Sequence, residues 1–247
     1  MAITGTPIRP VTAPVRIRIL IQPRSRLSLS PLPPGKENPI NGSVPEYTTK
    51  QFLTGAAIFE GGLLLAALVL GWLVGTDPLA ELTFNRKDVL LGLIATLPML
   101  VFLFVCLIAP TEGLARIRDF LRQTISPLLS QCRLPDLILL ATLAGVCEEV
   151  FFRGFLYLAI EPLNPFLAVL TTNLLFGLAH AVTPLYTVLA AFLGLYLTSL
   201  LSIDSTPNLL VPVIAHAVYD LLAFLLIIRD YRHWMQDQKR LQNDADP

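Results

Sequence analysis

Residues 136–158 read DLILLATLAGVCEEVFFRGFLYL, and this stretch decides the fold. It is almost entirely apolar and, as a helix, long enough to cross a bilayer, for which about 20 residues are needed. It nevertheless carries two adjacent carboxylates and a guanidinium, at Glu148, Glu149 and Arg153. Charged groups inside a membrane are costly, so they are usually paired and serve a function. The stretch therefore predicts a transmembrane helix that carries chemistry.

Other apolar runs lie on both sides of this one. They are found at about 52–75, 89–109, 166–181, 185–203 and 209–228. The chain is 54% hydrophobic and only 15% charged, whereas soluble domains carry about 25% charged residues. So few charges argue against a disordered chain, a nucleic-acid-binding protein and an ordinary water-soluble enzyme. We predict an all-α, polytopic transmembrane helical bundle of about six spans, embedded in a lipid bilayer.

The two ends of the chain are polar. Residues 1–48 are rich in Pro, Arg and Ser and predict a disordered arm, and residues 231–247 form a polar C-terminal tail. The membrane domain between them covers 49–230, with a motif-bearing core at 136–228. The arm has no acidic residue before Glu37, which suits a cytoplasmic tail or an organelle transit peptide. We expect a multi-pass protein of a bacterial plasma membrane in preference to a chloroplast or other organelle membrane.

Positive charge predicts the orientation of the bundle. With six spans and a cytoplasmic N-terminus, fifteen of the 18 Lys and Arg residues fall in cytoplasmic segments, so the positive-inside rule places both termini in the cytoplasm. Residues 112–130 between the second and third runs have apolar side chains every three or four positions, which indicates an amphipathic helix. This helix lies either on the membrane surface or packed on the bundle as a connection.

The ionisable residues of the apolar runs have helical spacing. Glu149 and Arg153 are four residues apart, share one helix face and are expected to form an ion pair that supports the site structurally. Glu148 points about 100° away from that face, is left free and is placed to act as a general base. His216 and Asp220 are again four residues apart, so the carboxylate can orient the imidazole.

For the remaining polar residues of the apolar runs, the spacing along one helix gives less information about their role. His180 would share one polar cavity with Glu148 and His216 if their helices converge. Cys147 reads as a small buried hydrophobic residue, and Glu60 stands alone in the first run without an assigned role. The three cysteines include no CxxC pair, which argues against a disulfide framework or a thiolate zinc site.

Three short motifs together resemble those of the CAAX prenyl protease and bacteriocin-processing (CPBP) family of intramembrane proteases. This family includes CAAX prenyl protease 2 and proteins like lysostaphin-resistance protein A. EEVFFR at 148–153 resembles the family's EExxxR motif, FGLAH at 176–180 its FxxxH motif and HAVYD at 216–220 its HxxxN/D motif. Each motif is weak alone, but three in this order on three apolar segments are specific. The resemblance covers residues 136–228.

The resemblance implies an endopeptidase with its active site inside the membrane. It would hydrolyse a peptide bond in a membrane-tethered or hydrophobic peptide. By position, Glu148 would activate water and His180 would help to hold it. His216 and Asp220 would stabilise the tetrahedral oxyanion. The other function classes that we consider are a proton-coupled transporter and a non-catalytic membrane scaffold or bacteriocin-immunity protein of the same fold.

The resemblance leaves the need for a metal open, because the family is viewed either as metalloproteases or as glutamate-dependent proteases. Asn, the alternative at position 220 in the motif, can donate a hydrogen bond to an oxyanion, but an ionised Asp cannot. Asp220 is better suited to bind a metal or to orient His216. If a metal is used, His180, His216 and Asp220 are the candidate ligands of a Zn ion, with Glu148 as the base.

Overall fold

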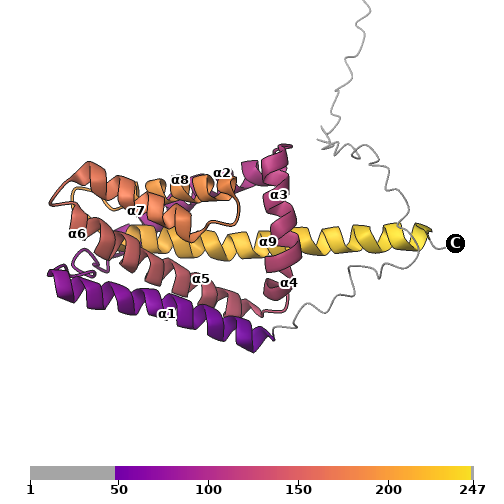
Figure 1. Cartoon of the computed structure of the whole chain (residues 1–247), viewed down its shortest axis with the longest axis horizontal. Coiled ribbons are helices and arrows are strands. Elements are labelled where there is room, and N and C mark those ends of the chain that lie inside the picture. Colours follow the sequence, from indigo (N-terminus) through magenta and orange to yellow (C-terminus); the bar gives the residue numbers. More distant parts are fainter. Residues whose placement is uncertain (1–47, 246–247) are drawn as a thin grey trace, which may run out of the picture. The chain divides into compact units, whose positions relative to one another are not determined.

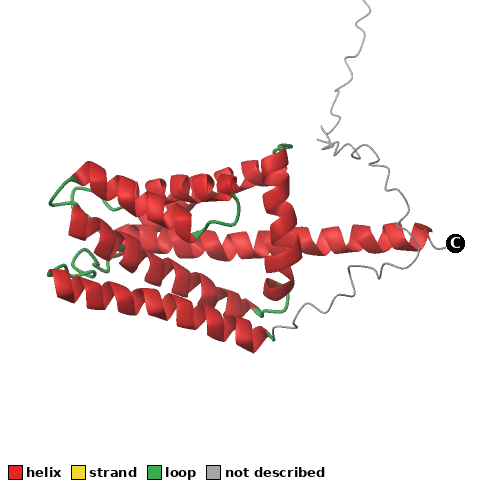
Figure 2. Cartoon of the chain, viewed as in Figure 1, coloured by secondary structure: helices red, strands yellow, loops and turns green. Residues whose placement is uncertain are grey.

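The computed structural model describes residues 48–245, which are helical almost throughout and contain no strand (Figure 2). Residues 1–47 of the predicted arm and 246–247 of the tail lie outside the described residues. The helices are α1 (Thr49–Val74), α2 (Arg86–Ile108), α3 (Glu112–Phe120), α4 (Ser126–Leu129), α5 (Leu134–Glu149), α6 (Leu158–Ile160), α7 (Pro165–Ala179), α8 (Pro184–Leu200) and α9 (Leu210–Ala245). Two π-helical segments, Leu121–Ile125 and Val150–Tyr157, join α3 to α4 and α5 to α6.

All six apolar runs of the sequence are helical, which confirms the all-α fold. Helices α1, α2 and α9 are long and apolar enough to cross a membrane, whereas the apolar helices α7 and α8 are shorter, with 15 and 17 residues. The run that decides the fold is helical without a break from 134 to 160, and its second half is the π-helical segment and α6. Helix α9 continues through the polar tail, well beyond the predicted end of its apolar run at 228.

Local sequence explains where the helices begin and end. Thr48 starts α1 with a capping box, in which its side chain and that of Gln51 each accept a hydrogen bond from the other residue's backbone N–H. Gly75 ends α1 with a φ of 77°, a left-handed conformation that favours glycine. Pro165 and Pro184 occupy the first positions of α7 and α8, where a missing N–H costs nothing. These signals divide the apolar sequence into separate helices.

Helix α9 forms the centre of the bundle and packs on both α2 and α5, while α1 lies along α5 and α7 pairs with α8 (Figure 1). Glycines permit the close approach of α9 to its neighbours. A Cβ at Gly145 of α5 would lie 2.7 Å from the Cβ of Ala217, and one at Gly92 of α2 would lie 2.7 Å from that of Ile214. The backbones of α5 and α2 can therefore approach α9, which places the motif residues of α5 and α9 side by side.

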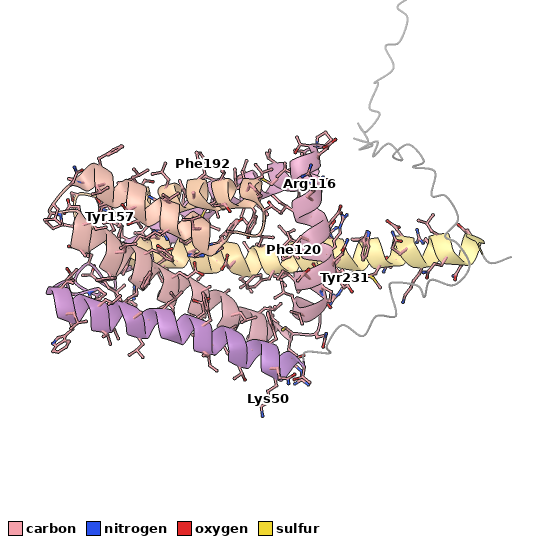
Figure 3. All side chains as sticks on the ribbon, in the orientation of Figure 1. Lys50, Arg116, Phe120, Tyr157, Phe192 and Tyr231 are labelled. Carbon is pink, nitrogen blue, oxygen red and sulfur yellow. The ribbon has the colours of Figure 1, made fainter. Side chains whose placement is uncertain are left out.

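The outer surface of the bundle is apolar. Large hydrophobic side chains point outward from several helices, among them Trp72, which is 80% exposed, and Phe166, which is 75% exposed. Figure 3 shows Phe192 on the outer side of α8, and it is 60% exposed. An apolar surface of this extent is typical of proteins that contact lipid, so it fits the predicted membrane location.

The predicted amphipathic helix at 112–130 is present as α3, the π-helical segment after it and α4, and it runs across one end of the bundle (Figure 1). Ile117 and Leu129 are buried. Arg122 donates two hydrogen bonds to Asp230 of α9, at 2.7 and 2.9 Å. The bond to this carboxylate raises the pKa of Arg122, so the guanidinium stays charged. These contacts pack the segment on the bundle, as in one of the two alternatives left by the sequence.

Candidate active site

Arg153 lies at the centre of a buried polar network. It projects from the π-helical segment and, like Glu149, has a side chain with no exposed surface. Its Nη1 donates to Glu149 Oε1 at 2.8 Å, and its Nη2 donates to the carbonyl oxygen of Gly194 in α8 at 2.7 Å. The guanidinium also lies 4.5 Å from the ring centroid of Phe176. The predicted ion pair between Glu149 and Arg153 is therefore present. The bond from Arg153 to Gly194 joins this pair to α8.

Two hydroxyl and amide side chains extend this network. Arg153 Nε donates to Thr198 Oγ1 at 3.3 Å, and Thr198 Oγ1 donates to Asn173 Oδ1 at 3.0 Å. Asn173 itself donates to the carbonyl oxygen of Val169, one turn earlier in α7. The sequence offered no role for Thr198, because a single threonine in an apolar helix carries no signal of its own. The network connects the π-helical segment, α7 and α8 around one guanidinium.

His216 lies between two carboxylates, those of Glu149 and of Asp220. Its Nδ1 lies 2.8 Å from Glu149 Oε1, the oxygen that also accepts from Arg153. Its Nε2 lies 3.6 Å from Asp220 Oδ2, which is too long for a hydrogen bond. The predicted neighbour Asp220 is therefore present, and the close packing of α5 on α9 adds Glu149 as the hydrogen-bonded partner, which spacing along α9 alone could not show.

Glu148 is the carboxylate that the network leaves without a bond. It is 7% exposed, its Oε2 is buried, and neither oxygen makes a hydrogen bond to a described residue. Its Oε2 lies 3.8 Å from His180 Nε2 at the end of α7. Polar atoms at such a distance are commonly bridged by water. Glu148 and His180 are thus near enough for one water molecule to contact both, with Glu148 reached through the part of its side chain that is 10% exposed.

The contact that His180 Nδ1 makes decides which tautomer of the ring is present. Nδ1 lies 2.8 Å from the carbonyl oxygen of Phe176. A carbonyl only accepts hydrogen bonds, so Nδ1 carries the proton and Nε2 of the neutral ring is an acceptor. A water between Nε2 and Glu148 would therefore donate one hydrogen to each. This arrangement directs an oxygen lone pair of the water away from both groups.

A cavity of about 170 Å³ opens beside these residues. His180, His216 and Asp220 contribute to its wall. Most of the remaining lining is apolar and comes from α2, α3, α8 and α9, including Met99, Phe102, Leu193 and Phe224. A few convergent polar groups at one place in an apolar cavity are the usual composition of a binding site. The cavity suits a hydrophobic or lipid-linked ligand.

Glu60 of α1 joins the site, although the sequence left it without a role. It interacts electrostatically with Glu148, His216 and Asp220, and its Oε2 is buried without a hydrogen-bond partner among the described residues. Cys147 is buried and has no disulfide partner, and it lies near enough to interact with Glu60 and Glu148. The signal that could have found Glu60 was its charge, isolated within an apolar run.

The three candidate zinc ligands, His180, His216 and Asp220, line the same cavity. Among residues 48–245, no three His, Cys, Asp or Glu side chains come together as a metal site. His180 and His216 each use Nδ1 in a short contact, with a carbonyl oxygen and with Glu149, respectively. Zinc requires ligands converging at about 2.0–2.2 Å. Ligation by His180, His216 and Asp220 stays a prediction, and we derive no step through a metal.

One segment of the chain matches a known protein family. Residues 130–222 match the family described as type II CAAX prenyl endopeptidase Rce1-like. The chain carries an Rce1-like domain. No curated protein and no solved structure matches the chain. The matched residues include all three motifs, which confirms the resemblance to the CPBP intramembrane proteases. At the level of this family, the match supports a membrane-embedded protease, which is a hydrolase.

Proposed function

We propose that this protein is an intramembrane endopeptidase of the CAAX-protease type in which Glu148 activates the attacking water. The observation that carries the proposal is the unbonded carboxylate of Glu148, 3.8 Å from the acceptor nitrogen of His180. General bases are commonly carboxylates placed within reach of a water molecule in a site of this kind. The Rce1-like domain supports the same class of reaction.

The reaction would proceed through a tetrahedral intermediate. Glu148 takes a proton from the bound water while the water oxygen forms a bond to the carbonyl carbon of the substrate. The carbonyl oxygen becomes an oxyanion, which hydrogen-bond donors of the site stabilise. The C–N bond then breaks, and Glu148 transfers the proton to the leaving amine. The carboxylate of Glu148 is regenerated, so one water is consumed for each peptide bond hydrolysed.

The surroundings of Glu148 support a glutamate-type mechanism. Glu149 carries hydrogen bonds from Arg153 and His216 on one oxygen, so it is less available for proton transfer than Glu148. We therefore assign Glu149 and Arg153 to the support of the site. The largely apolar wall of the cavity favours a membrane-tethered or hydrophobic peptide as substrate.

The test is peptide hydrolysis by the full chain reconstituted in lipid vesicles. Two quenched fluorescent peptides would be used, one with a farnesylated CAAX end and one with the same sequence but no lipid. We expect Glu148→Gln to lower the rate by about 10²–10⁴-fold. The matched control is Glu112→Gln, because Glu112 is exposed and makes only a 3.7 Å contact with Arg116. Equal rates for wild type and Glu148→Gln would overturn the assignment of Glu148.

A further inference from the structure

The proposed reaction needs a hydrogen-bond donor that the motif residues do not readily supply. His216 uses Nδ1 toward Glu149, and its Nε2 lies 3.6 Å from the carboxylate of Asp220, which competes for any proton that Nε2 carries. Asp220 is an acceptor whenever it is ionised, and Nε2 of neutral His180 is an acceptor as well. An oxyanion formed between these groups would meet lone pairs on most sides. Stabilisation of an oxyanion requires N–H or O–H groups aimed at it.

Tyr186 offers such a group. It lies in the first turn of α8, where its backbone N–H donates to the side chain of Thr183 at 3.1 Å and so fixes the start of the helix. Its side chain lines the same cavity as His180, His216 and Asp220. Its hydroxyl makes no hydrogen bond to another residue of the described part of the chain. The phenolic O–H is thus available to a ligand in the cavity.

Two carboxylates of the site lie near Tyr186. It interacts electrostatically with both Asp220 and Glu148. Tyr219 lines the same cavity, but the groups with which it interacts are Asp220, Tyr186 and Cys106. Of the two tyrosines, Tyr186 is therefore the one that interacts with both Glu148, the proposed base, and Asp220. The oxyanion develops next to the carbon that this water attacks, so a donor is needed in the same place.

We infer that Tyr186 is a further catalytic residue, whose hydroxyl donates a hydrogen bond to the oxyanion of the tetrahedral intermediate. This inference rests on the proposed endopeptidase function. It explains how a site with Asp at position 220 can stabilise negative charge, since the tyrosine supplies a donor that an ionised aspartate lacks. The hydroxyl proton stays on Tyr186 throughout, so no additional proton acceptor is required.

The test is the rate of a cleavage that requires Glu148, measured with Tyr186→Phe in the reconstituted full chain. Phenylalanine keeps the ring and removes only the hydroxyl. Loss of one oxyanion donor should lower kcat by about 10²–10³-fold, with little change in KM. Tyr157→Phe is the matched control, because Tyr157 lies outside the cavity lining, at the end of the π-helical segment (Figure 3). Tyr219→Phe tests the neighbouring hydroxyl in the same cavity.

The outcomes separate this inference from the function on which it rests. If no cleavage depends on Glu148, the proposed function is overturned and the role of Tyr186 with it. If cleavage depends on Glu148 but Tyr186→Phe stays within about twofold of wild type, the inference alone is overturned. A loss of kcat in Tyr219→Phe that is absent in Tyr186→Phe would also overturn it. An equal loss in Tyr157→Phe would show that the effect is structural.

Discussion

The polar site has two sides that are built differently. On one side, Arg153 and Glu149 have no exposed side-chain surface, and short hydrogen bonds join them to each other and to α8 and α9. On the other side, Glu148, His180 and Asp220 approach their nearest charged partners only to 3.8 or 3.6 Å and retain some exposed side-chain surface. The first side uses its charges to hold helices together, while the second leaves the carboxylates of Glu148 and Asp220 without a hydrogen bond to a described residue.

This difference explains why two adjacent glutamates can have different roles. A buried charge is tolerated when it is paired and hydrogen-bonded, and removal of one partner leaves an uncompensated charge. A buried polar atom without a partner calls for another explanation, such as water or a catalytic role. Glu149 fits the first description through the two bonds on Oε1, although its Oε2 is buried without a partner among the described residues. Glu148 fits the second, because neither of its oxygens is hydrogen-bonded to a described residue. Changes on the two sides should therefore have separable effects on folding and on cleavage.

The largest effect is expected on the bonded side. Arg153→Met keeps much of the side-chain volume but leaves Glu149 without its guanidinium, which should cost about 3–5 kcal/mol of stability. Thermal unfolding of the detergent-solubilised protein would measure this loss. Arg116→Met is the control, because its 75% exposed side chain makes a surface pair worth about 1 kcal/mol or less. If Arg153→Met had the melting temperature of the wild type, the hydrogen-bonded side of the site would not stabilise the fold, and the two sides would not differ as described.

A smaller effect is expected where the network meets the backbone. A Cβ added by Gly194→Ala would lie 2.9 Å from Phe176 Cδ1 and 3.1 Å from Arg153 Nη2. Both neighbours are held in place, so the overpacking should cost about 1–3 kcal/mol. Gly62→Ala is the matched control in an apolar helix, because nothing lies within 4 Å of its added Cβ. Equal melting temperatures for the two variants would show that the network is more adaptable than described.

The smallest effect is expected on the cavity side. Asp220→Asn should leave the melting temperature unchanged, because Asp220 makes no hydrogen bond to His216 across 3.6 Å. Cleavage should stay within about tenfold of wild type, since an amide can donate to the oxyanion as well as accept. The steady-state rate with the quenched peptide measures this. A loss of stability in Asp220→Asn would place Asp220 among the supporting residues instead.

The sequence predicted what depends on one helix at a time. The apolar runs, the amphipathic segment and the ion pair of Glu149 with Arg153 follow from hydropathy and from spacing along a single helix. Contacts between helices could not be predicted from the sequence, because they depend on how the side chains of distant segments pack. His216 is 67 residues from Glu149 in the sequence, yet the two are hydrogen-bonded. Glu60 and Tyr186 also reach the site only through packing between helices.

The most direct test of the account compares cells that carry the wild-type chain with cells that carry only Glu148→Gln. Protein termini would be mapped across the membrane proteome in both, and the amount of the protein in the membrane would be measured. The account predicts termini that appear only with the wild type, while both forms accumulate equally. Identical sets of termini at equal amounts of the two forms would contradict it and would favour a non-catalytic scaffold of the same fold.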